Sequence, residues 1–142
     1  MKDIVWTSSE TAKAIGGKAA GDWQASGVSI DSRTLEPGDL FVALKDVSDG
    51  HAYVAAALKK GAAAALVSQI PHDVDAARCL VVADTTQALV ALGKARRKEL
   101  KATTIGLTGS VGKTSTKEML ALALLNVAVA HAGPWRRLAR LS

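Results

Sequence analysis

The segment Thr108-Gly109-Ser110-Val111-Gly112-Lys113-Thr114 carries the strongest indication of how this chain folds and what it binds. It follows a short apolar run at 104–107, which predicts a strand, and precedes an amphipathic stretch at 114–125, which predicts a helix. Glycines let the backbone curl so that successive N–H groups point at phosphate oxygens, and the helix amino terminus adds its positive dipole end. The segment therefore predicts a phosphate-binding loop for ATP, in which Lys113 reaches the β- and γ-phosphates and Thr114 holds Mg²⁺.

The loop departs from the commonest spacing of such motifs. That spacing puts a glycine at the position of Leu107, whereas Gly106 lies one residue early. The alternative is a glycine-rich turn between a strand and a helix, with an exposed lysine. Gly-Lys-Thr at the start of a helix is uncommon in plain turns, so nucleotide binding is favoured, with Lys113 as the catalytic residue. The expected cofactor-binding residues are Thr108, Gly109, Ser110, Val111, Gly112, Lys113 and Thr114.

Upstream of the loop, helical and strand patterns alternate along the chain. Thr7 and Glu10 form a capping-box pattern, and Asp84 with Gln87 forms a second helix start. The expected strands are 28–30, 40–44, 64–67 and 79–82, and the expected helices begin near residues 7, 51 and 84. In the second helix, Tyr53, Val54, Ala57 and Leu58 are expected on the buried face. This alternation predicts an α/β fold, with a βα phosphate-loop unit beginning near residue 103.

Composition narrows the functional classes. The chain has 142 residues, of which 49% are hydrophobic and 22% charged, as in a soluble globular protein. No apolar run approaches the roughly 18 residues needed to span a bilayer, and no signal peptide is apparent, so a cytoplasmic protein without a membrane partner is expected. Cys79 is the only cysteine, which excludes an internal disulfide, and the three histidines lack the spacing of a zinc site.

The net charge of +5 raises the alternative of a nucleic-acid-binding module. Part of the excess lies in the predicted helix that ends near residue 100, at Lys94, Arg96, Arg97, Lys98 and Lys101. No aromatic residue is interleaved there for base stacking, so a solvated helix face is the favoured interpretation and no nucleic-acid partner is expected.

The loop without its first glycine resembles that of the Mur ligases and folylpolyglutamate synthases. Its continuation, Lys117-Glu118-Met119-Leu120, resembles the Mur ligases that add D-alanyl-D-alanine. Upstream motifs agree with this family over about residues 1–125. They are Ser29-Ile30-Asp31-Ser32-Arg33, the segment from Glu36 to Leu44, Asp49-Gly50-His51 and Gly61-Ala62.

The resemblance implies an ATP-dependent amide ligase of peptidoglycan synthesis. In this family, ATP activates the carboxylate of a UDP-N-acetylmuramoyl tripeptide as an acyl phosphate, which the amine of D-alanyl-D-alanine attacks. It also implies a small α/β domain at 1–84 that binds the UDP-muramoyl peptide. Residues 85–142 would then form a linker helix and the first βα unit of an incomplete, parallel-sheet ATP-binding domain, with an atypical tail at 126–142.

The same resemblance implies that Ser32 and Arg33 contact the UDP end of the substrate. The alternative is a turn in which Asp31 and Arg33 satisfy each other. Asp49-Gly50-His51 is expected to be structural, as a tight turn before a helix. The chain by itself is expected to be inactive as a ligase. Two alternatives stay open: a non-catalytic nucleotide-binding fragment, and the sibling Mur ligase that adds the third peptide residue.

Overall fold

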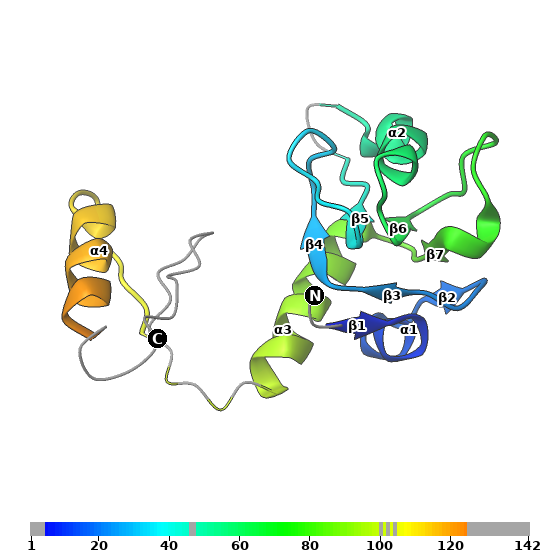
Figure 1. Cartoon of the computed structure of the whole chain (residues 1–142). Coiled ribbons are helices and arrows are strands. Elements are labelled where there is room, and N and C mark those ends of the chain that lie inside the picture. Colours follow the sequence, from blue (N-terminus) through cyan, green and yellow to red (C-terminus); the bar gives the residue numbers. More distant parts are fainter. Residues whose placement is uncertain (1–4, 46–47, 100, 102, 104, 125–142) are drawn as a thin grey trace. The chain divides into compact units, whose positions relative to one another are not determined.

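The computed structural model describes residues 5–45, 48–99, 101, 103 and 105–124. Figure 1 shows these residues in colour and labels the helices and strands. The chain forms two compact units, Met1–Lys101 and Ala102–Ser142. Each unit is described by itself below.

A five-stranded sheet organises the first unit. In spatial order its strands are β2 (Lys18–Ala19), β7 (Cys79–Val81), β6 (Ala64–Val67), β5 (Asp39–Val42) and β4 (Gly27–Ser29). Strands β4 to β7 are mutually parallel, and β2 joins β7 antiparallel. β5 and β6 are buried along their whole length, as expected for central parallel strands covered on both faces. The predicted α/β class is therefore confirmed. The parallel strands observed here belong to the first unit, whereas the parallel sheet was expected for the ATP-binding domain at 85–142.

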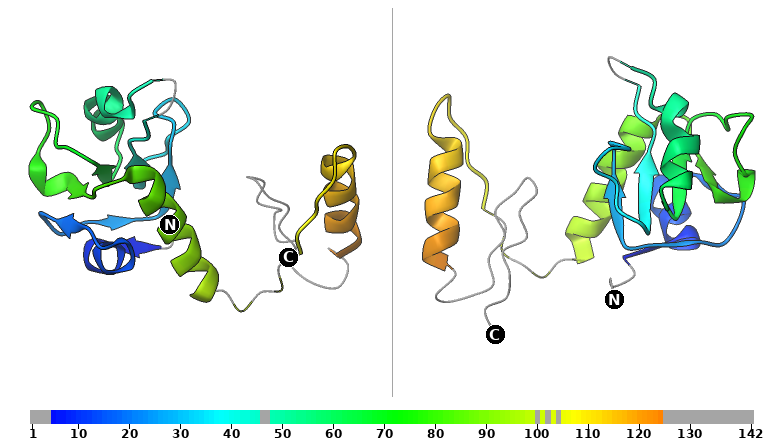
Figure 2. Two further views of the ribbon diagram at one scale, coloured as in Figure 1. Left: turned by 180° about the vertical axis from the view of Figure 1, so that it is seen from behind. Right: turned by 45° about the horizontal axis from the view of Figure 1, so that its top comes forward.

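Two separate core clusters cover the two faces of this sheet. Leu40, Val42 and Leu66 pack on one face with residues of α3 (Thr85–Glu99), and α1 (Ser8–Ile15) adds partly buried side chains. The intervening residues, such as Phe41 and Val67, pack on the other face with α2 (Val54–Lys59). Both views in Figure 2 show α2 on the opposite side of the sheet from α1 and α3. Alternation along each strand thus places one helical layer on each face.

Smaller elements complete the first unit. An antiparallel pair joins β1 (Trp6–Thr7) to β3 (Gln24–Ala25). The 3₁₀ turn η1 (Gly50–Tyr53) leads into α2, and η2 (Ala76–Arg78) precedes β7. Tyr53 ends η1 with 46% of its surface exposed, so its predicted place on a buried helix face is wrong. The buried face begins one residue later, at Val54.

The helix starts predicted near residues 7 and 84 are confirmed, whereas the helix expected from His51 begins at Val54, after the turn η1. The Glu10 N–H donates to Thr7 Oγ1 and the Thr7 N–H donates to the Glu10 carboxylate, each at 3.3 Å, which completes a capping box. Asp84 Oδ1 accepts from the N–H groups of Thr86 and Gln87 at 2.8 and 2.9 Å. These bonds satisfy amide donors that a helix amino terminus otherwise leaves without partners.

Helix α3 belongs to the first compact unit. Its Ala88 and Leu92 are buried in the same cluster as Leu40 and Leu66, so the unit extends past the expected boundary at residue 84 to Lys101. None of the helices in the part of the chain that the structure describes has the length and apolar character needed to cross a membrane.

In the second unit, the described residues form one helix, α4 (Lys113–Leu124), close to its predicted bounds. Residues 105–107 of the predicted strand have no strand assignment, so that prediction is wrong for them, and Thr104 lies outside the described residues. A strand needs a hydrogen-bonded neighbour, and residues 105–124 supply none. Ile105 and Leu107 accordingly keep 54% and 39% of their surfaces exposed. The tail at 126–142 also lies outside the described residues.

Candidate functional site

Three loops that leave the carboxyl ends of parallel strands carry the predicted site residues of the first unit and one further polar residue, Ser68. Ser32 and Arg33 follow β4, Asp49 and His51 follow β5, and Ser68 comes directly after β6. In open α/β sheets, ligands bind outside the carboxyl ends of the strands. The fold therefore starts these loops at the edge of the sheet where a ligand site is expected.

The turn after β4 contains a bidentate ion pair. Arg33 Nε donates to Asp31 Oδ1 at 3.0 Å, and its Nη2 donates to Oδ2 at 2.8 Å. The Arg33 backbone N–H also donates to Oδ1, at 2.9 Å. Hydrogen bonds from the Arg33 side chain, and then from its backbone, lower the pKa of Asp31 to about 2. The turn in which Asp31 and Arg33 pair, which was the alternative to contact with the substrate, is thus present.

This pairing leaves the arginine open to solvent. The Arg33 side chain is 87% exposed, and a guanidinium presents five N–H donors in a planar fork, more than one carboxylate takes up. The hydrogen bond to Asp31 raises the pKa of Arg33 above its usual value, and the nearby Tyr53 phenol adds a smaller electrostatic effect in the same direction. The side chain is therefore held as a charged fork at the surface, a form that suits phosphate recognition.

His51 joins the loops after β5 and β6 from a buried position. The Ser68 backbone N–H donates to His51 Nε2 at 2.9 Å, and Ser68 Oγ lies 3.1 Å from the same nitrogen. Since Nε2 accepts, the ring proton is assigned to Nδ1, which donates to Asp49 Oδ1 at 2.6 Å. Hydrogen bonds from the backbone and then the ring of His51 lower the pKa of Asp49.

Asp49, His51 and Ser68 have the order of a catalytic triad, but the geometry favours a structural lock. A general base must have a free nitrogen to take the proton of the serine hydroxyl. Here the Ser68 backbone amide already occupies His51 Nε2, and His51 is only 7% exposed. The arrangement supports the structural interpretation of Asp49-Gly50-His51.

The loop at 108–114 adopts a conformation that depends on its glycines. Gly109 and Gly112 have φ values of 148° and 76°, in the range that side chains with a Cβ rarely adopt. The Lys113 ammonium donates to the Gly109 carbonyl, which closes the loop on itself. The Thr116 N–H donates to the Gly112 carbonyl at 2.9 Å as the first turn of α4 forms. The curl and the helix amino terminus are those that phosphate binding requires.

The donor set at this loop also fits a magnesium ion held partly by phosphate. Among the described residues, no group of three or more His, Cys, Asp or Glu side chains lies close enough together to hold a metal ion. Mg²⁺ at nucleotide sites takes most of its ligands from phosphates, water and one or two side-chain oxygens. The Thr114 hydroxyl is such an oxygen, at the second residue of α4.

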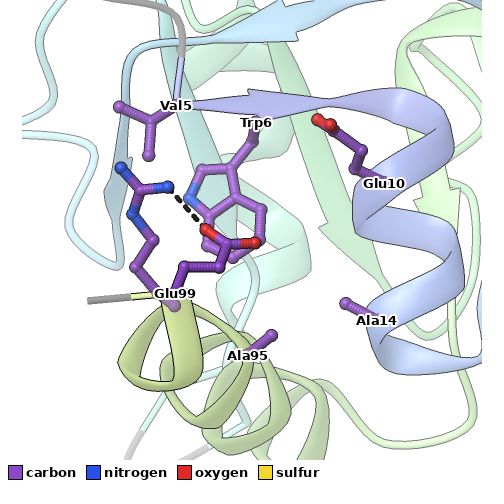
Figure 3. A pocket seen from close by; sticks show the side chains of 7 residues that line it. Val5, Trp6, Glu10, Ala14, Ala95 and Glu99 are labelled. Atoms are coloured by element: carbon purple, nitrogen blue, oxygen red, sulfur yellow. Dashed lines mark hydrogen bonds and ion pairs between the residues drawn. The ribbon is translucent and has the colours of Figure 1, made fainter. Parts of the chain in front are cut away.

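A cavity elsewhere in the first unit contains none of the predicted site residues. It has a volume of about 240 Å³ and lies among β1, α1 and α3, as Figure 3 shows. Its lining residues are Val5, Trp6, Glu10, Ala14, Ala95, Arg96 and Glu99. The charged groups have partners within the chain: Arg96 Nη1 donates to Glu99 at 2.7 Å, and Glu10 accepts from the Thr7 hydroxyl. This cavity offers few polar groups to orient a ligand.

Two residues that make contacts at the carboxyl edge and its turn, Ser68 and Lys60, were not predicted from the sequence. Ser68 bonds His51 across 17 residues, and Lys60 donates to the carbonyls of Ser32 and Arg33 across 28 and 27 residues. No local pattern indicates either pair. The structure places Ser32 and Arg33 in one turn, and it places residues 108–114 at the beginning of one helix, as expected.

Comparison with known proteins gives one consistent family. The family model described as "Mur ligase family, catalytic domain" matches residues 24–101. The chain is 36% identical over 121 residues to the UDP-N-acetylmuramoyl-tripeptide--D-alanyl-D-alanine ligase of Rickettsia prowazekii. That match covers 85% of this chain and 27% of the relative, so the chain spans about a quarter of the relative's length.

Solved structures agree with this similarity. The crystal structure of MurF from Acinetobacter baumannii superposes with a TM-score of 0.73 at 38% identity, over 87% of this chain and 28% of that one. The MurF ligase of Thermotoga maritima, solved in complex with ADP, gives a TM-score of 0.59 at 34% identity, over 70% and 23%.

Proposed function

Because this chain belongs to the Mur ligase family, we propose that it provides the UDP-substrate-binding unit and the phosphate loop of an ATP-dependent amide ligase. The proposed reaction joins D-alanyl-D-alanine to UDP-N-acetylmuramoyl tripeptide during peptidoglycan precursor synthesis, in the cytoplasm. The observation that carries the proposal is the loop at 108–114, with two positive-φ glycines and a lysine at the start of α4. The named relatives supply the substrates.

The chemistry requires placement and charge neutralisation. The γ-phosphoryl group of ATP passes to the tripeptide carboxylate, which gives an acyl phosphate and ADP. The amine of the dipeptide then attacks the acyl carbon, and phosphate leaves as the amide forms. Lys113 would release the Gly109 carbonyl and bind the β- and γ-phosphates, so that its charge offsets the charge that develops on the transferring group.

The other loop residues would hold the nucleotide in position. The backbone from Thr108 to Gly112 would present N–H groups to the phosphates, and the α4 amino terminus would add its dipole. The Thr114 hydroxyl would be one ligand of Mg²⁺, and the ion would supply positive charge that offsets the charge of the phosphates. Holding reactants in this way is where most of the rate enhancement of phosphoryl transfer originates.

In the first unit, we assign the UDP end of the substrate to the turn after β4, with 1–84 as the substrate-binding domain and α3 packed against it. The exposed Arg33 fork suits the diphosphate, and the half-buried Ser32 hydroxyl suits a uracil edge. The Asp31 pair supports this role, because it fixes one side of the guanidinium and leaves the group exposed.

The test is a titration of the chain with ATP and Mg²⁺ by calorimetry. Lys113→Ala should weaken binding by roughly tenfold or more, as expected for a charge-assisted contact to phosphate. Lys117→Ala is the matched control, because Lys117 lies on the same helix and pairs with Glu118 at 3.7 Å. Equal affinity in the parent and the Lys113 variant would contradict the assignment of the loop.

A further inference from the structure

A single lysine from another element holds the turn that carries Ser32 and Arg33. Within the turn, the Ser29 hydroxyl and the Leu35 N–H both donate to the Asp31 carbonyl, each at 3.0 Å. The next two carbonyls along the chain receive the ammonium of Lys60, at 3.1 Å for Ser32 and 2.5 Å for Arg33. Three successive carbonyls of one exposed turn are thus bonded.

The backbone that carries this ammonium is itself fixed. Lys60 is the carboxyl cap of α2, and its N–H donates to the Ala56 carbonyl at 3.0 Å. Gly61 follows with a φ of 106°, and its carbonyl accepts from the Gly38 N–H at 2.8 Å. At the other end, the turn is anchored by Leu35, which is 3% exposed in the core cluster that includes α2 residues. Lys60 therefore bridges two parts of one packed framework.

The charged groups at the turn favour the binding of an anion. One carboxylate, Asp31, pairs with Arg33, while the Lys60 ammonium adds a second cation. An ammonium that donates to two neutral carbonyls keeps its full positive charge beside them. The turn thus carries two cations and one anion, and the Asp31 carboxylate accepts from both the guanidinium and the backbone N–H of Arg33.

We infer that Lys60 is a positioning residue of the UDP subsite, which rests on the function proposed above. Its ammonium fixes the backbone from which the Ser32 hydroxyl and the Arg33 guanidinium extend, so that both groups are oriented before the ligand arrives. Preorganisation of this kind raises affinity because less conformational freedom is lost on binding. Lys60 acts through the turn and makes no contact with the substrate in this account.

The experiment compares Lys60→Met with Lys59→Met in the 142-residue chain. Lys59 is the neighbouring exposed lysine on α2, so both variants lose the same charge within one residue. Calorimetry with UDP should show a roughly tenfold loss of affinity for Lys60→Met, about the contribution of one charge-assisted hydrogen bond, and little loss for Lys59→Met. Lys60→Arg, which can donate to both carbonyls, should restore most of the affinity.

A double-mutant cycle separates positioning from direct contact. In an Arg33→Ala and Ser32→Ala background, Lys60→Met should cause little further loss, because the groups that it orients are gone. A full tenfold loss in that background would overturn the inference and indicate that Lys60 binds the phosphates itself. Equal losses in the Lys59 and Lys60 variants would also overturn it, as they would indicate a general effect of net charge.

Amide hydrogen exchange supplies a readout without ligand. Exchange at Leu35, whose N–H is bonded within the turn, should accelerate in Lys60→Met but not in Lys59→Met. Unchanged exchange would contradict the proposal that Lys60 fixes the turn, even if the affinity for UDP falls. If the parent chain binds no UDP while Lys60→Met still loosens the turn, the proposed UDP site is wrong and Lys60 has only a structural role.

Discussion

The sheet unit and the phosphate loop reach their shapes by different means. The turn at 31–34 lies on a unit whose central strands are buried on both faces, and long-range contacts from Lys60 and Leu35 hold it. The loop at 108–114 is exposed throughout, and its helix buries only Ala121 among the residues described. The first region therefore depends on tertiary packing, whereas the second depends on local backbone geometry.

The largest effect should come from the sheet core. Leu66→Ala shortens a fully buried side chain on β6, the strand between β5 and β7. It should lower the free energy of unfolding by about 2–5 kcal/mol. Leu122→Ala in α4, where the side chain is 64% exposed, should change it by less than about 0.5 kcal/mol. Urea unfolding followed by the fluorescence of Trp6 and Trp23, both in the core cluster, measures the first effect. Equal losses of stability in the Leu66 and Leu122 variants would contradict the contrast between the sheet unit and the phosphate loop.

The next effect concerns the histidine lock between the loops after β5 and β6. His51→Ala leaves the Ser68 N–H without its acceptor and should destabilise the first unit by about 1–3 kcal/mol. Ser68→Ala keeps that backbone bond and removes only the hydroxyl, so a smaller loss is expected. Thermal unfolding of both variants tests this order. A larger loss in the serine variant would mean that the hydroxyl, and not the amide, is the important partner of His51.

A glycine pair tests whether the loop depends on local geometry. Gly112→Ala forces a Cβ into a backbone with φ of 76°, a strain of about 1–2 kcal/mol, and should weaken ATP binding by about five- to thirtyfold. Gly106 has no positive φ, and an added Cβ would meet nothing within 4 Å, so Gly106→Ala should bind ATP normally. A strong effect at Gly106 would show that the glycine one residue early has a role in the loop after all.

The smallest effect is a pH titration of the exposed ion pair. Because the pKa of Asp31 is lowered from 3.8 to about 2, its contribution to stability is present above pH 3.8 and is lost as the pH falls towards 2. The carboxyl carbon shift, followed by NMR, should titrate with a midpoint near 2. Arg33→Met should move this midpoint up towards 3.8, since the guanidinium is its main cause. A midpoint near 3.8 in the parent would contradict the pair.

The elements that the sequence predicted well are those whose signal is local. The strand at 64–67 appears with the predicted bounds, because a short, continuous apolar run fits a central parallel strand. Thr7 and Asp84 start the two helices by side-chain bonds within three residues. The predicted strand at 104–107 fails for its described residues, because an apolar run is a strand only when a neighbour pairs with it.

The partners of the site residues had no local signal. Lys60 contacts the turn after β4, and Ser68 contacts His51, because the fold brings distant loops together. Strands β1 and β3 span two residues each, which is too few for a periodic pattern. Conversely, the seven residues of the phosphate loop are contiguous, so their motif was visible at once. Their roles, and those of Ser32 and Arg33, stay predictions until ligands are bound.

The most direct test of the account is a cross-titration with two ligands and two variants. Parent, Arg33→Ala and Lys113→Ala chains are each titrated by calorimetry with UDP-N-acetylmuramoyl tripeptide and with ATP and Mg²⁺. The account predicts that Arg33→Ala loses affinity only for the UDP ligand, and Lys113→Ala only for ATP. Loss of the same ligand in both variants, or binding of neither ligand by the folded parent, would contradict the assignment of one ligand to each region.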